Sequence, residues 1–326
     1  MPAPRELFQQ QLPFTLESTA LPGLPTPRRG KVRDVYTRGD ELLLVTTDRL
    51  SAFDRVLTTL PFKGQLLNQL AAFWFEKTKD IARSHLLEVP DANVLVGRRC
   101  QPLPVEVVLR GYLTGSLWRD YQAGIANDNY GLALPAGLTK DARFDAPICT
   151  PSTKAEGGAH DAPLSEASLL AQGLVAPSVW REARRLALLL FERGQAWAAS
   201  RGLLLVDTKY EFGLTPEGEL LLIDEIHTPD SSRYWIAAQS EQRWAHGEPQ
   251  QMLDKENLRQ WLLTEHGFSG HGDPPPIPDS VRIDLARIYA DTYERLTGEV
   301  PQLTVGPVGE RLERALQQRG YLGVIS

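Results

Sequence analysis

The feature that most constrains the fold is the stretch of residues 203–235, which reads LLLVDTKYEFGLTPEGELLLIDEIHTPDSSRYW. After the apolar run LLLV, the charged residues Asp207, Lys209 and Glu211 occupy every second position. Successive side chains of a β-strand point to opposite faces, so these three groups share one face. A Thr-Pro-Glu-Gly turn and a second apolar run follow. The sequence therefore predicts a β-hairpin with charged groups near its open end.

The charged face of this hairpin needs a partner. Solvated charges are common on exposed hairpins, but both predicted strands contain continuous aliphatic runs, which favours a hairpin inside a domain. Carboxylates in that setting need a cation or strong hydrogen bonds to remain charged. Mg²⁺ is usually held by one or two carboxylates together with phosphate oxygens. We therefore expect metal–phosphate chemistry at this face, although the hairpin alone does not identify the reaction.

Length and composition bound the class of protein. A chain of 326 residues suggests two lobes, and its 42% hydrophobic and 23% charged residues are typical of a globular protein. The net charge of −6 and the pI near 5.6 weigh against nucleic-acid binding. Cys100 and Cys149 are the only cysteines, so a disulfide framework or a structural zinc site is not expected. We recognise neither a signal peptide nor a membrane span, and expect a cytoplasmic protein.

Other segments carry weaker signals, each with a simple structural alternative. Residues 30–36 (GKVRDVY) place a glycine before a lysine and an arginine, which is typical of a phosphate-binding turn or of a solvated basic run. Residues 47–54 are predicted to be a polar loop that surface solubility alone would explain. Arg110 ends a buried run and needs an anion, which is either a ligand or Glu106. Residues 147–161 lack periodicity and indicate either a functional lid or a mobile surface loop.

The remaining elements frame these signals. The proline-rich link QPLP at residues 101–104 predicts a hinge between lobes. Apolar positions at helical spacing, each followed within two residues by a glycine, predict helices in the second half of the chain. The predicted helices cover residues 178–200, 257–266, 280–296 and 309–319.

Six motifs, in order along nearly the whole chain, resemble the phosphoribosylaminoimidazole-succinocarboxamide synthases, the SAICAR synthetase family of purine biosynthesis. The length of the chain resembles the longer form of that family. The motifs are GKVRDVY (30–36), TDRLSAFD (47–54), LRGYLTGSLW (109–118), TPSTKAE (150–156), LVDTKYEFGL (205–214) and DEIHTPDSSRYW (224–235).

The resemblance implies an ATP-dependent ligase that joins L-aspartate to the carboxylate of carboxyaminoimidazole ribonucleotide through an acyl phosphate, releasing ADP and phosphate. It implies an α+β, two-lobed, ATP-grasp-like fold with the nucleotide in the cleft between the lobes. We expect a β-rich lobe with the phosphate loop over residues 1–104, and a lobe with the metal-binding hairpin and C-terminal helices over residues 105–326. The expected partners are ATP, the ribonucleotide and L-aspartate, with Mg²⁺ as cofactor. Nucleic acid and membrane are not expected, and a monomer is favoured over a homo-oligomer.

The resemblance also implies roles for individual residues. The implied ATP-binding residues are Gly30, Lys31, Val32, Arg33, Cys100, Leu103 and Lys209. The implied substrate-binding residues are Asp48, Ser51, Arg110, Ser116, Lys154, Asp230 and Arg233, with Lys154 assigned to L-aspartate. The implied magnesium ligands are Glu211 and Asp224, and the implied catalytic groups are Lys209, Arg233 and Asp207, the last as an orienting group.

The register of the hairpin can be set in two ways. Pairing of Thr215 with Glu219, across a type I turn with a glycine bulge, would put Glu225 on the charged face. Pairing of Leu214 with Glu219 would put Asp224 there instead, because a slip of one residue reverses every side chain. The resemblance implies Asp224 as the metal ligand. We therefore predict the second register, with Asp224 pointing to the metal site and Glu225 away from it.

Two other functions would use the same features. A nucleotide-binding regulator without catalysis should have lost acids or basic groups, yet no motif position is visibly replaced here. A small-molecule kinase would transfer phosphate stably without any need for L-aspartate. The dependence of ADP release on L-aspartate separates the ligase from both.

Overall fold

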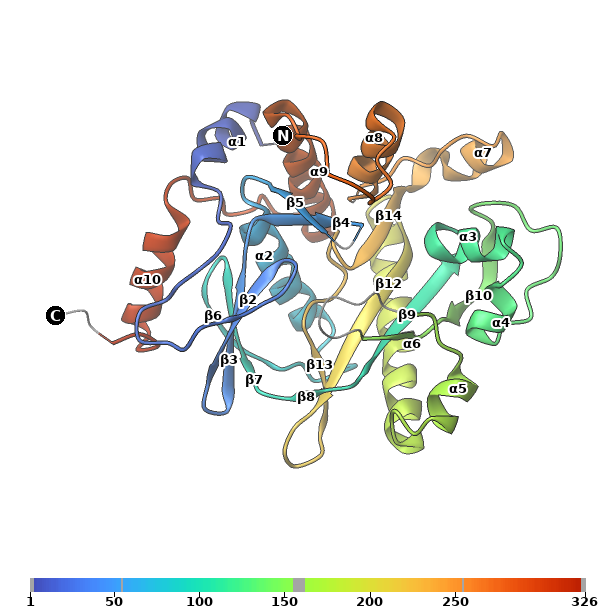
Figure 1. Ribbon diagram of the computed structural model, residues 1–326, viewed down its shortest axis with the longest axis horizontal. Coiled ribbons are helices and arrows are strands. Elements are labelled where there is room, and N and C mark those ends of the chain that lie inside the picture. The colour runs from blue at the N-terminus through green and yellow to red at the C-terminus, as the bar shows by residue number, and fades with distance from the viewer. Residues whose placement is uncertain (1–2, 54, 155–161, 254, 324–326) are drawn as a thin grey trace.

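Two antiparallel sheets with helices packed around them form the α+β architecture that the sequence predicts (Figure 1). The computed structural model describes residues 3–53, 55–154, 162–253 and 255–323. Within these ranges, no helix combines the length and the apolar character that crossing a membrane requires. The segment that the sequence marks as a lid or mobile loop is described only in part, because residues 155–161 lie outside these ranges.

The first sheet is built from strands whose apolar side chains alternate between two covered faces. Tyr36, Leu43 and Val45 point to one face, where they pack with Leu312 of the C-terminal helix α10. Leu44 points to the other face and enters the main core. The strand order is β1 (Arg28–Arg29), β2 (Arg33–Arg38), β3 (Glu41–Thr46), β7 (Val94–Arg98) and β6 (Leu86–Asp91), and a separate hairpin joins β4 (Arg49–Ala52) to β5 (Arg55–Thr59).

The second sheet is organised around one long strand, β12 (Leu203–Leu214). The first part of β12 pairs with β14 (Ser232–Ile236) on one side and with β9 (Val105–Tyr112) on the other. Its last part pairs with β13 (Leu220–Ile223) and with β8 (Gln101–Pro102). The sheet continues beyond β9 to β10 (Arg143–Cys149), and β9 also pairs with the short β11 (Ser152–Thr153). Of the charged residues of β12, Asp207 therefore pairs with strands on both sides, whereas Lys209 pairs with β9 and Glu211 with β13.

The helices confirm the four predicted from the sequence to within one residue at either end. The longest, α6 (Pro177–Ser200), packs along β12 and β9, while α9 (Asp279–Thr297) packs against α1 (Arg5–Gln11) and α2 (Lys63–Lys77). The other elements are η1 (Leu12–Phe14), α3 (Gly115–Gln122), α4 (Ala126–Tyr130), α5 (Glu166–Ala171), η2 (Ala237–Gln239), α7 (Ser240–Ala245), α8 (Glu256–His266) and α10 (Val308–Gln318).

One apolar core extends through both sheets. Leu44 and Leu95 of the first sheet belong to the same buried cluster as Leu109 and Phe212 of the second. The helix α10, close to the C-terminus, covers the outer face of the first sheet (Figure 1). The division of the chain into two lobes at residue 104 stays a prediction. The last helix, α10, packs against strands of the first 104 residues.

Candidate functional site

Three charged side chains meet on one rung of the second sheet. Asp207 of β12 lies opposite Arg110 of β9 and opposite Arg233 of β14. Arg233 Nη1 donates to Asp207 Oδ2 at 2.5 Å, and Arg110 Nη1 lies 3.5 Å from the same oxygen. The sequence left Arg110 with either a ligand or Glu106 as its anion. In the structure its internal partner is Asp207.

The remaining nitrogens of Arg110 are also engaged. Nε donates to Thr150 Oγ1 at 2.8 Å, and Nη2 donates to Ser116 Oγ at 3.1 Å. Burial lowers the pKa of Arg110, and the charge of Asp207 opposes that change. The planar guanidinium is thus held by three elements, β12, the start of α3 and the segment after β10.

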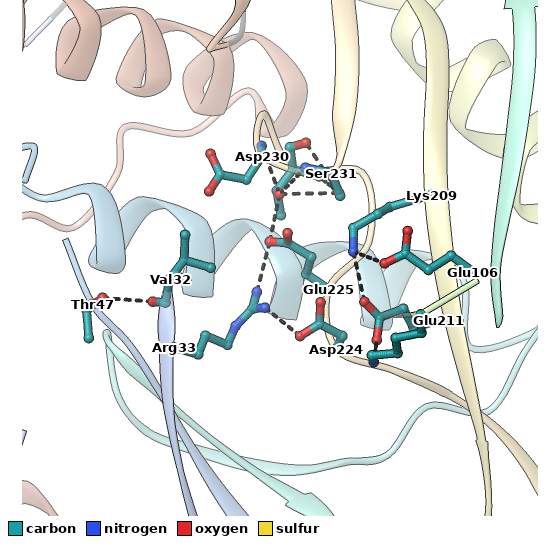
Figure 2. Close-up of polar contacts among 12 residues, drawn as sticks. Val32, Arg33, Thr47, Glu106, Lys209, Glu211, Asp224, Glu225, Asp230 and Ser231 are labelled. Carbon is teal, nitrogen blue, oxygen red and sulfur yellow. Dashed lines mark hydrogen bonds and ion pairs between the residues drawn. The ribbon is translucent and has the colours of Figure 1, made fainter. Parts of the chain in front are cut away.

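Two residues further along β12, Lys209 bridges two carboxylates (Figure 2). Its Nζ donates to Glu106 Oε1 at 2.7 Å and to Glu211 Oε1 at 2.8 Å. Burial alone would lower the pKa of Lys209, but Glu211 and Glu106 raise it well above its usual range. Lys154 donates to the other oxygen of Glu211. Burial alone would raise the pKa of Glu211, but Lys209 and Lys154 hold it well below the usual range, so the carboxylate stays ionised.

The predicted register of the hairpin is wrong. Leu214 pairs with Leu220, and Thr215 N donates to Glu219 O at 2.9 Å. Gly218 N donates to Thr215 O at 2.9 Å and has a φ of +86°. This is the type I turn closed by a left-handed glycine that the Thr-Pro-Glu-Gly sequence favours. The turn chemistry therefore decides the pairing.

Asp224 nevertheless shares a cavity with Glu211. The strand β13 ends at Ile223, and Asp224 has a φ of +67°, so the alternation of side chains stops before it. Asp224 lines two neighbouring cavities, whereas Glu225 lines only one of them. Both acids bind Arg33, with Nη1 2.5 Å from Asp224 Oδ1 and Nη2 2.8 Å from Glu225 Oε2. As predicted, Asp224 lines the cavity of Glu211 and Glu225 does not. The two acids do not point fully apart, however, because both bind Arg33.

Three cavities surround this cluster. The arginine cavity, of about 360 Å³, is lined by the groups Lys31, Arg33, Ser51, Glu106, Asp207, Lys209, Asp224, Glu225, Asp230, Arg233, Lys255, Glu256 and Arg259, among others. The lysine cavity, of about 320 Å³, shares Lys31, Lys209 and Asp224 with it and adds Lys154, His85 and Glu211. The apolar cavity, of about 1090 Å³, shares Leu42, Cys100 and Lys154 with the lysine cavity and adds Leu103, Leu174, Val175, Val179 and Leu214.

The predicted phosphate loop lies between the first two cavities. Lys31 and Val32 line both of them, and Gly30 lines the lysine cavity. Arg33, also predicted to meet phosphate, is buried and binds two carboxylates. Burial alone would lower its pKa, but Asp224 and Glu225 raise it. Lys31 and Arg33 both line the two cavities, but Arg33 is held by two carboxylates, whereas Lys31 is exposed.

The predicted hinge lies along the apolar cavity. Cys100 and Leu103 both line it. Leu103 N donates to Phe212 O at 2.8 Å, so this amide is already used in the second sheet. A ligand in this cavity would meet the side chain of Leu103 rather than its N–H.

The substrate-binding predictions have different outcomes in the structure. Ser51 lines the arginine cavity. Asp230 lines it too, with its carboxylate held by Lys63 Nζ at 2.7 Å and Tyr289 Oη at 2.6 Å. Burial alone would raise the pKa of Asp230, but Lys63 and Lys255 hold it well below the usual range.

Asp48 does not join the site. It is not among the residues that line the three cavities. Its two oxygens accept hydrogen bonds from Leu16 N at 2.7 Å and Gly64 N at 2.8 Å, and burial raises its pKa to about 6. Asp48 therefore ties together three backbone segments, and its predicted contact with substrate is not supported by its position.

Sequence reasoning missed several residues at the site. Lys255 and Arg259 line the arginine cavity. They stand four positions apart at the start of a predicted helix, a spacing that puts both cations on the same face of the helix. His85 lines the lysine cavity, and burial lowers its pKa to about 4. Thr47 and Arg49 bind carbonyl groups of the phosphate loop. A loop motif alone gave no signal for these two contacts.

Comparison with known proteins places this site in a family. The sequence model described as SAICAR synthetase matches residues 26–272. A protein of Mesorhizobium japonicum, provisionally named phosphoribosylaminoimidazole-succinocarboxamide synthase 2, is 48% identical over 310 residues, 93% of this chain and 98% of the relative. The phosphoribosylaminoimidazole-succinocarboxamide synthase of Legionella pneumophila strain Lens is 43% identical over 94% of this chain and 99% of the relative. The structure of the Saccharomyces cerevisiae SAICAR synthase complexed with SAICAR is 34% identical, has a TM-score of 0.74, and covers 87% of this chain and 99% of its own.

The family model spans all three cavities and the hairpin between them, and the relatives cover nearly their full length. The two-lobed, ATP-grasp-like fold implied by the sequence motifs is the fold of these relatives. By motif order, by overall sequence and by fold, the chain belongs to the SAICAR synthetase family.

Proposed function

We propose that the chain is an ATP-dependent carbon–nitrogen ligase that joins L-aspartate to the carboxylate of carboxyaminoimidazole ribonucleotide, with release of ADP and phosphate, in purine biosynthesis. One observation carries the proposal. A cavity with three lysines and three carboxylates adjoins a cavity with several arginines, and Lys31, Lys209 and Asp224 line both. Phosphoryl transfer between two bound substrates needs such a shared boundary, because it depends mainly on positioning and charge neutralisation.

The lysine cavity suits the phosphates of ATP. Lys31, on the glycine-containing loop, lines it together with Lys209 and Lys154. The apolar cavity next to it, with Leu103 and Val179, suits a flat base. One solved relative, a SAICAR synthetase described as in complex with ADP, is 26% identical with a TM-score of 0.65, which supports nucleotide binding by this chain.

Magnesium fits the carboxylates of the lysine cavity. Among the described residues, no group of three or more histidine, cysteine, aspartate or glutamate side chains could hold a metal ion by itself. Glu211 and Asp224 nevertheless line one cavity, and one or two carboxylates with phosphate oxygens are the usual protein share of a Mg²⁺ site. Bound there, the ion would neutralise charge on the β- and γ-phosphates. Lys154 now binds Glu211, so coordination through that oxygen would require Lys154 to move.

The arginine cavity suits the anionic ribonucleotide. Arg110 and Ser116 lie behind Asp207, which orients Arg233 at the cavity wall. Lys255 and Arg259 supply further positive charge on the opposite element. A planar guanidinium can bind a carboxylate or phosphate through two parallel hydrogen bonds. In this proposal the arginines hold the ribonucleotide with its carboxylate toward Lys209.

The chemistry then needs two steps. A carboxylate oxygen of the ribonucleotide attacks the γ-phosphorus of ATP, and ADP leaves. The amine of L-aspartate attacks the acyl phosphate carbon, phosphate leaves, and the amine gives up a proton. Lys209 stays protonated because Glu106 and Glu211 raise its pKa, so its role is to stabilise negative charge on the transferred group rather than to accept a proton.

The test is ADP release from ATP and the ribonucleotide, measured with and without L-aspartate. The ligase predicts turnover that depends on L-aspartate and yields the succinocarboxamide product. Stable phosphate transfer without L-aspartate would indicate a kinase instead. The absence of turnover under both conditions, with ATP still bound, would indicate a nucleotide-binding protein without catalysis.

A further inference from the structure

The phosphate loop is held from behind through its own carbonyl groups. Gly30 N donates to Arg33 O at 2.7 Å, which closes a tight turn around Lys31. The carbonyl oxygens of Gly30, Lys31 and Val32 all accept hydrogen bonds from the segment 47–49. Hydrogen bonds thus fix three consecutive carbonyl groups of the loop. The backbone of Lys31, which lines both cavities, is fixed with them.

Arg49 makes most of these contacts. Its Nε donates to Lys31 O at 3.2 Å and its Nη2 to Gly30 O at 3.0 Å. Nη2 also donates to Asp34 Oδ1 at 2.8 Å, and Nη1 donates to Glu17 O. A guanidinium has five N–H donors, so four are used within the protein. Arg49 is buried and does not line the three cavities, which excludes it as a direct ligand of substrate there.

A second buried group fixes the orientation of Arg49. The Asp34 side chain has no exposed surface. Its Oδ2 accepts hydrogen bonds from Thr19 N at 2.7 Å and Thr19 Oγ1 at 2.9 Å, while Oδ1 faces Arg49. Tyr36 Oη in turn donates to Thr19 Oγ1 at 2.8 Å. A paired, hydrogen-bonded charge of this kind has one well-defined geometry, because any other would leave a buried charge without its partner.

Thr47 provides an independent hold on the same loop. Its N donates to Val32 O at 2.9 Å and its Oγ1 to the same oxygen at 2.8 Å (Figure 2). The Oγ1 contact can be removed without changing any charge. Thr47 Oγ1 also accepts from Arg49 N at 3.4 Å, but its removal leaves the contacts of the Arg49 guanidinium in place. Thr47 therefore allows the loop to be loosened without changing the Arg49 side chain.

We propose that Arg49 is a positioning residue for ATP: its guanidinium holds the carbonyl groups of Gly30 and Lys31 so that the loop presents Lys31 and its N–H groups in one fixed arrangement. The proposal rests on the proposed function, in which this loop binds the phosphates of ATP. A preorganised loop loses less conformational entropy when it binds, so loosening it weakens ATP binding without removing any group that touches ATP.

The test compares Arg49→Lys with Arg55→Lys, a change of an exposed arginine on the same β4–β5 hairpin whose guanidinium donates to Gly272 O instead of to the loop. Lysine keeps the charge of Arg49 but cannot reach two carbonyls and a carboxylate in the same plane. The measurements are amide hydrogen exchange of the peptide that contains residues 30–33, ATP affinity by calorimetry, and KM values for ATP and for the ribonucleotide.

We expect Arg49→Lys to speed exchange in residues 30–33 and to weaken ATP binding at least about tenfold, the effect of losing one or two hydrogen bonds to a charged donor. The KM for the ribonucleotide should change less than the KM for ATP, and Arg55→Lys should change neither. Unchanged loop exchange, unchanged ATP affinity, or an equal rise in both KM values would overturn the proposal.

Two further measurements keep the proposal testable. If Arg49→Lys does not fold, Thr47→Val supplies the same comparison, with a smaller expected loss of ATP affinity from one hydrogen bond. If Thr47→Val leaves both loop exchange and ATP affinity unchanged in that case, the proposal fails. Hydrogen exchange needs no substrate, so absence of catalysis in the unmodified protein would refute the proposed function without deciding the role of Arg49.

Discussion

The charged groups behind the arginine cavity are tested by Arg110→Lys, a substitution that keeps the charge and removes the planar fork. Arg110 does not line the cavity itself but contacts Asp207, which binds Arg233 at the cavity wall. The guanidinium presents Nε to Thr150 at 2.8 Å, Nη2 to Ser116 at 3.1 Å and Nη1 to Asp207 at 3.5 Å. A lysine ammonium is a single point charge, so it can satisfy about one of these directions. The other two are lost, which loosens Asp207 and with it the orientation of Arg233 toward the ribonucleotide.

The magnitude follows from those contacts. Hydrogen bonds to charged groups contribute roughly 1.5–3 kcal/mol each, so the loss of two predicts about 3–6 kcal/mol, divided between unfolding free energy and substrate binding. If only about 1.4 kcal/mol of this falls on binding, the KM for the ribonucleotide rises about tenfold. ATP lies in the neighbouring cavity, and its KM should change by less than about twofold.

The assay is steady-state turnover with each substrate varied in turn, accompanied by a thermal unfolding curve. Arg143→Lys is the matched control, since Arg143 is exposed on the adjacent strand β10. A lower melting temperature with an unchanged KM for the ribonucleotide would refute the reasoning and leave Arg110 as the internal partner of Asp207. Equal increases in the KM values for ATP and ribonucleotide would refute it as well.

Three other predictions test separate parts of the site. Lys31→Ala should weaken ATP binding by roughly 1.5–3 kcal/mol per lost phosphate contact with little change in melting temperature; normal ATP affinity by calorimetry would return the loop to a solvated basic run. Glu211→Gln should raise the Mg²⁺ concentration needed for half-maximal turnover, because one negatively charged ligand is lost; an unchanged magnesium titration would remove Glu211 from the metal site. Burial raises the pKa of Asp48 from 3.8 to about 6, so its ionisation opposes folding, and the stability of the unmodified protein relative to Asp48→Asn should fall as pH rises between these two values. Urea unfolding of both proteins across that range checks this, and a difference independent of pH would contradict it.

The sequence predicted the long elements well, because their periodic patterns repeat many times. The helix at residues 178–200 and the strand that carries Asp207, Lys209 and Glu211 are present as expected. The pairing register failed at one point, where Gly218 adopts a φ of +86°. Local turn preferences favour the observed register, in which Thr215 pairs with Glu219. The role implied for Asp224 favours the other register, and the prediction followed that role.

Long-range contacts could not be predicted in the same way. Asp224 reaches the lysine cavity only because its own φ is +67°, a value that no pattern in the sequence indicates. Arg33 meets Asp224 across 191 positions of chain, and it binds carboxylates where its motif suggested phosphate. The residue types of the site were predictable from motifs, whereas their partners depend on how the two sheets pack together.

The strand β12 has a further consequence for how the substrates meet. Asp207 and Glu211 stand four positions apart on it, which fixes a spacing of roughly 13 Å along the strand. A strand that is hydrogen-bonded to its neighbours does not lengthen. Asp207, beside Arg110 and Arg233, and Glu211, beside Lys154 and Lys209, therefore keep one separation when the surrounding loops move. β12 thus serves as a molecular ruler: Asp207 and Glu211, in the middle of the strand, set how far apart the ribonucleotide and the nucleotide phosphates lie. The surrounding loops need only close over a distance that is already set.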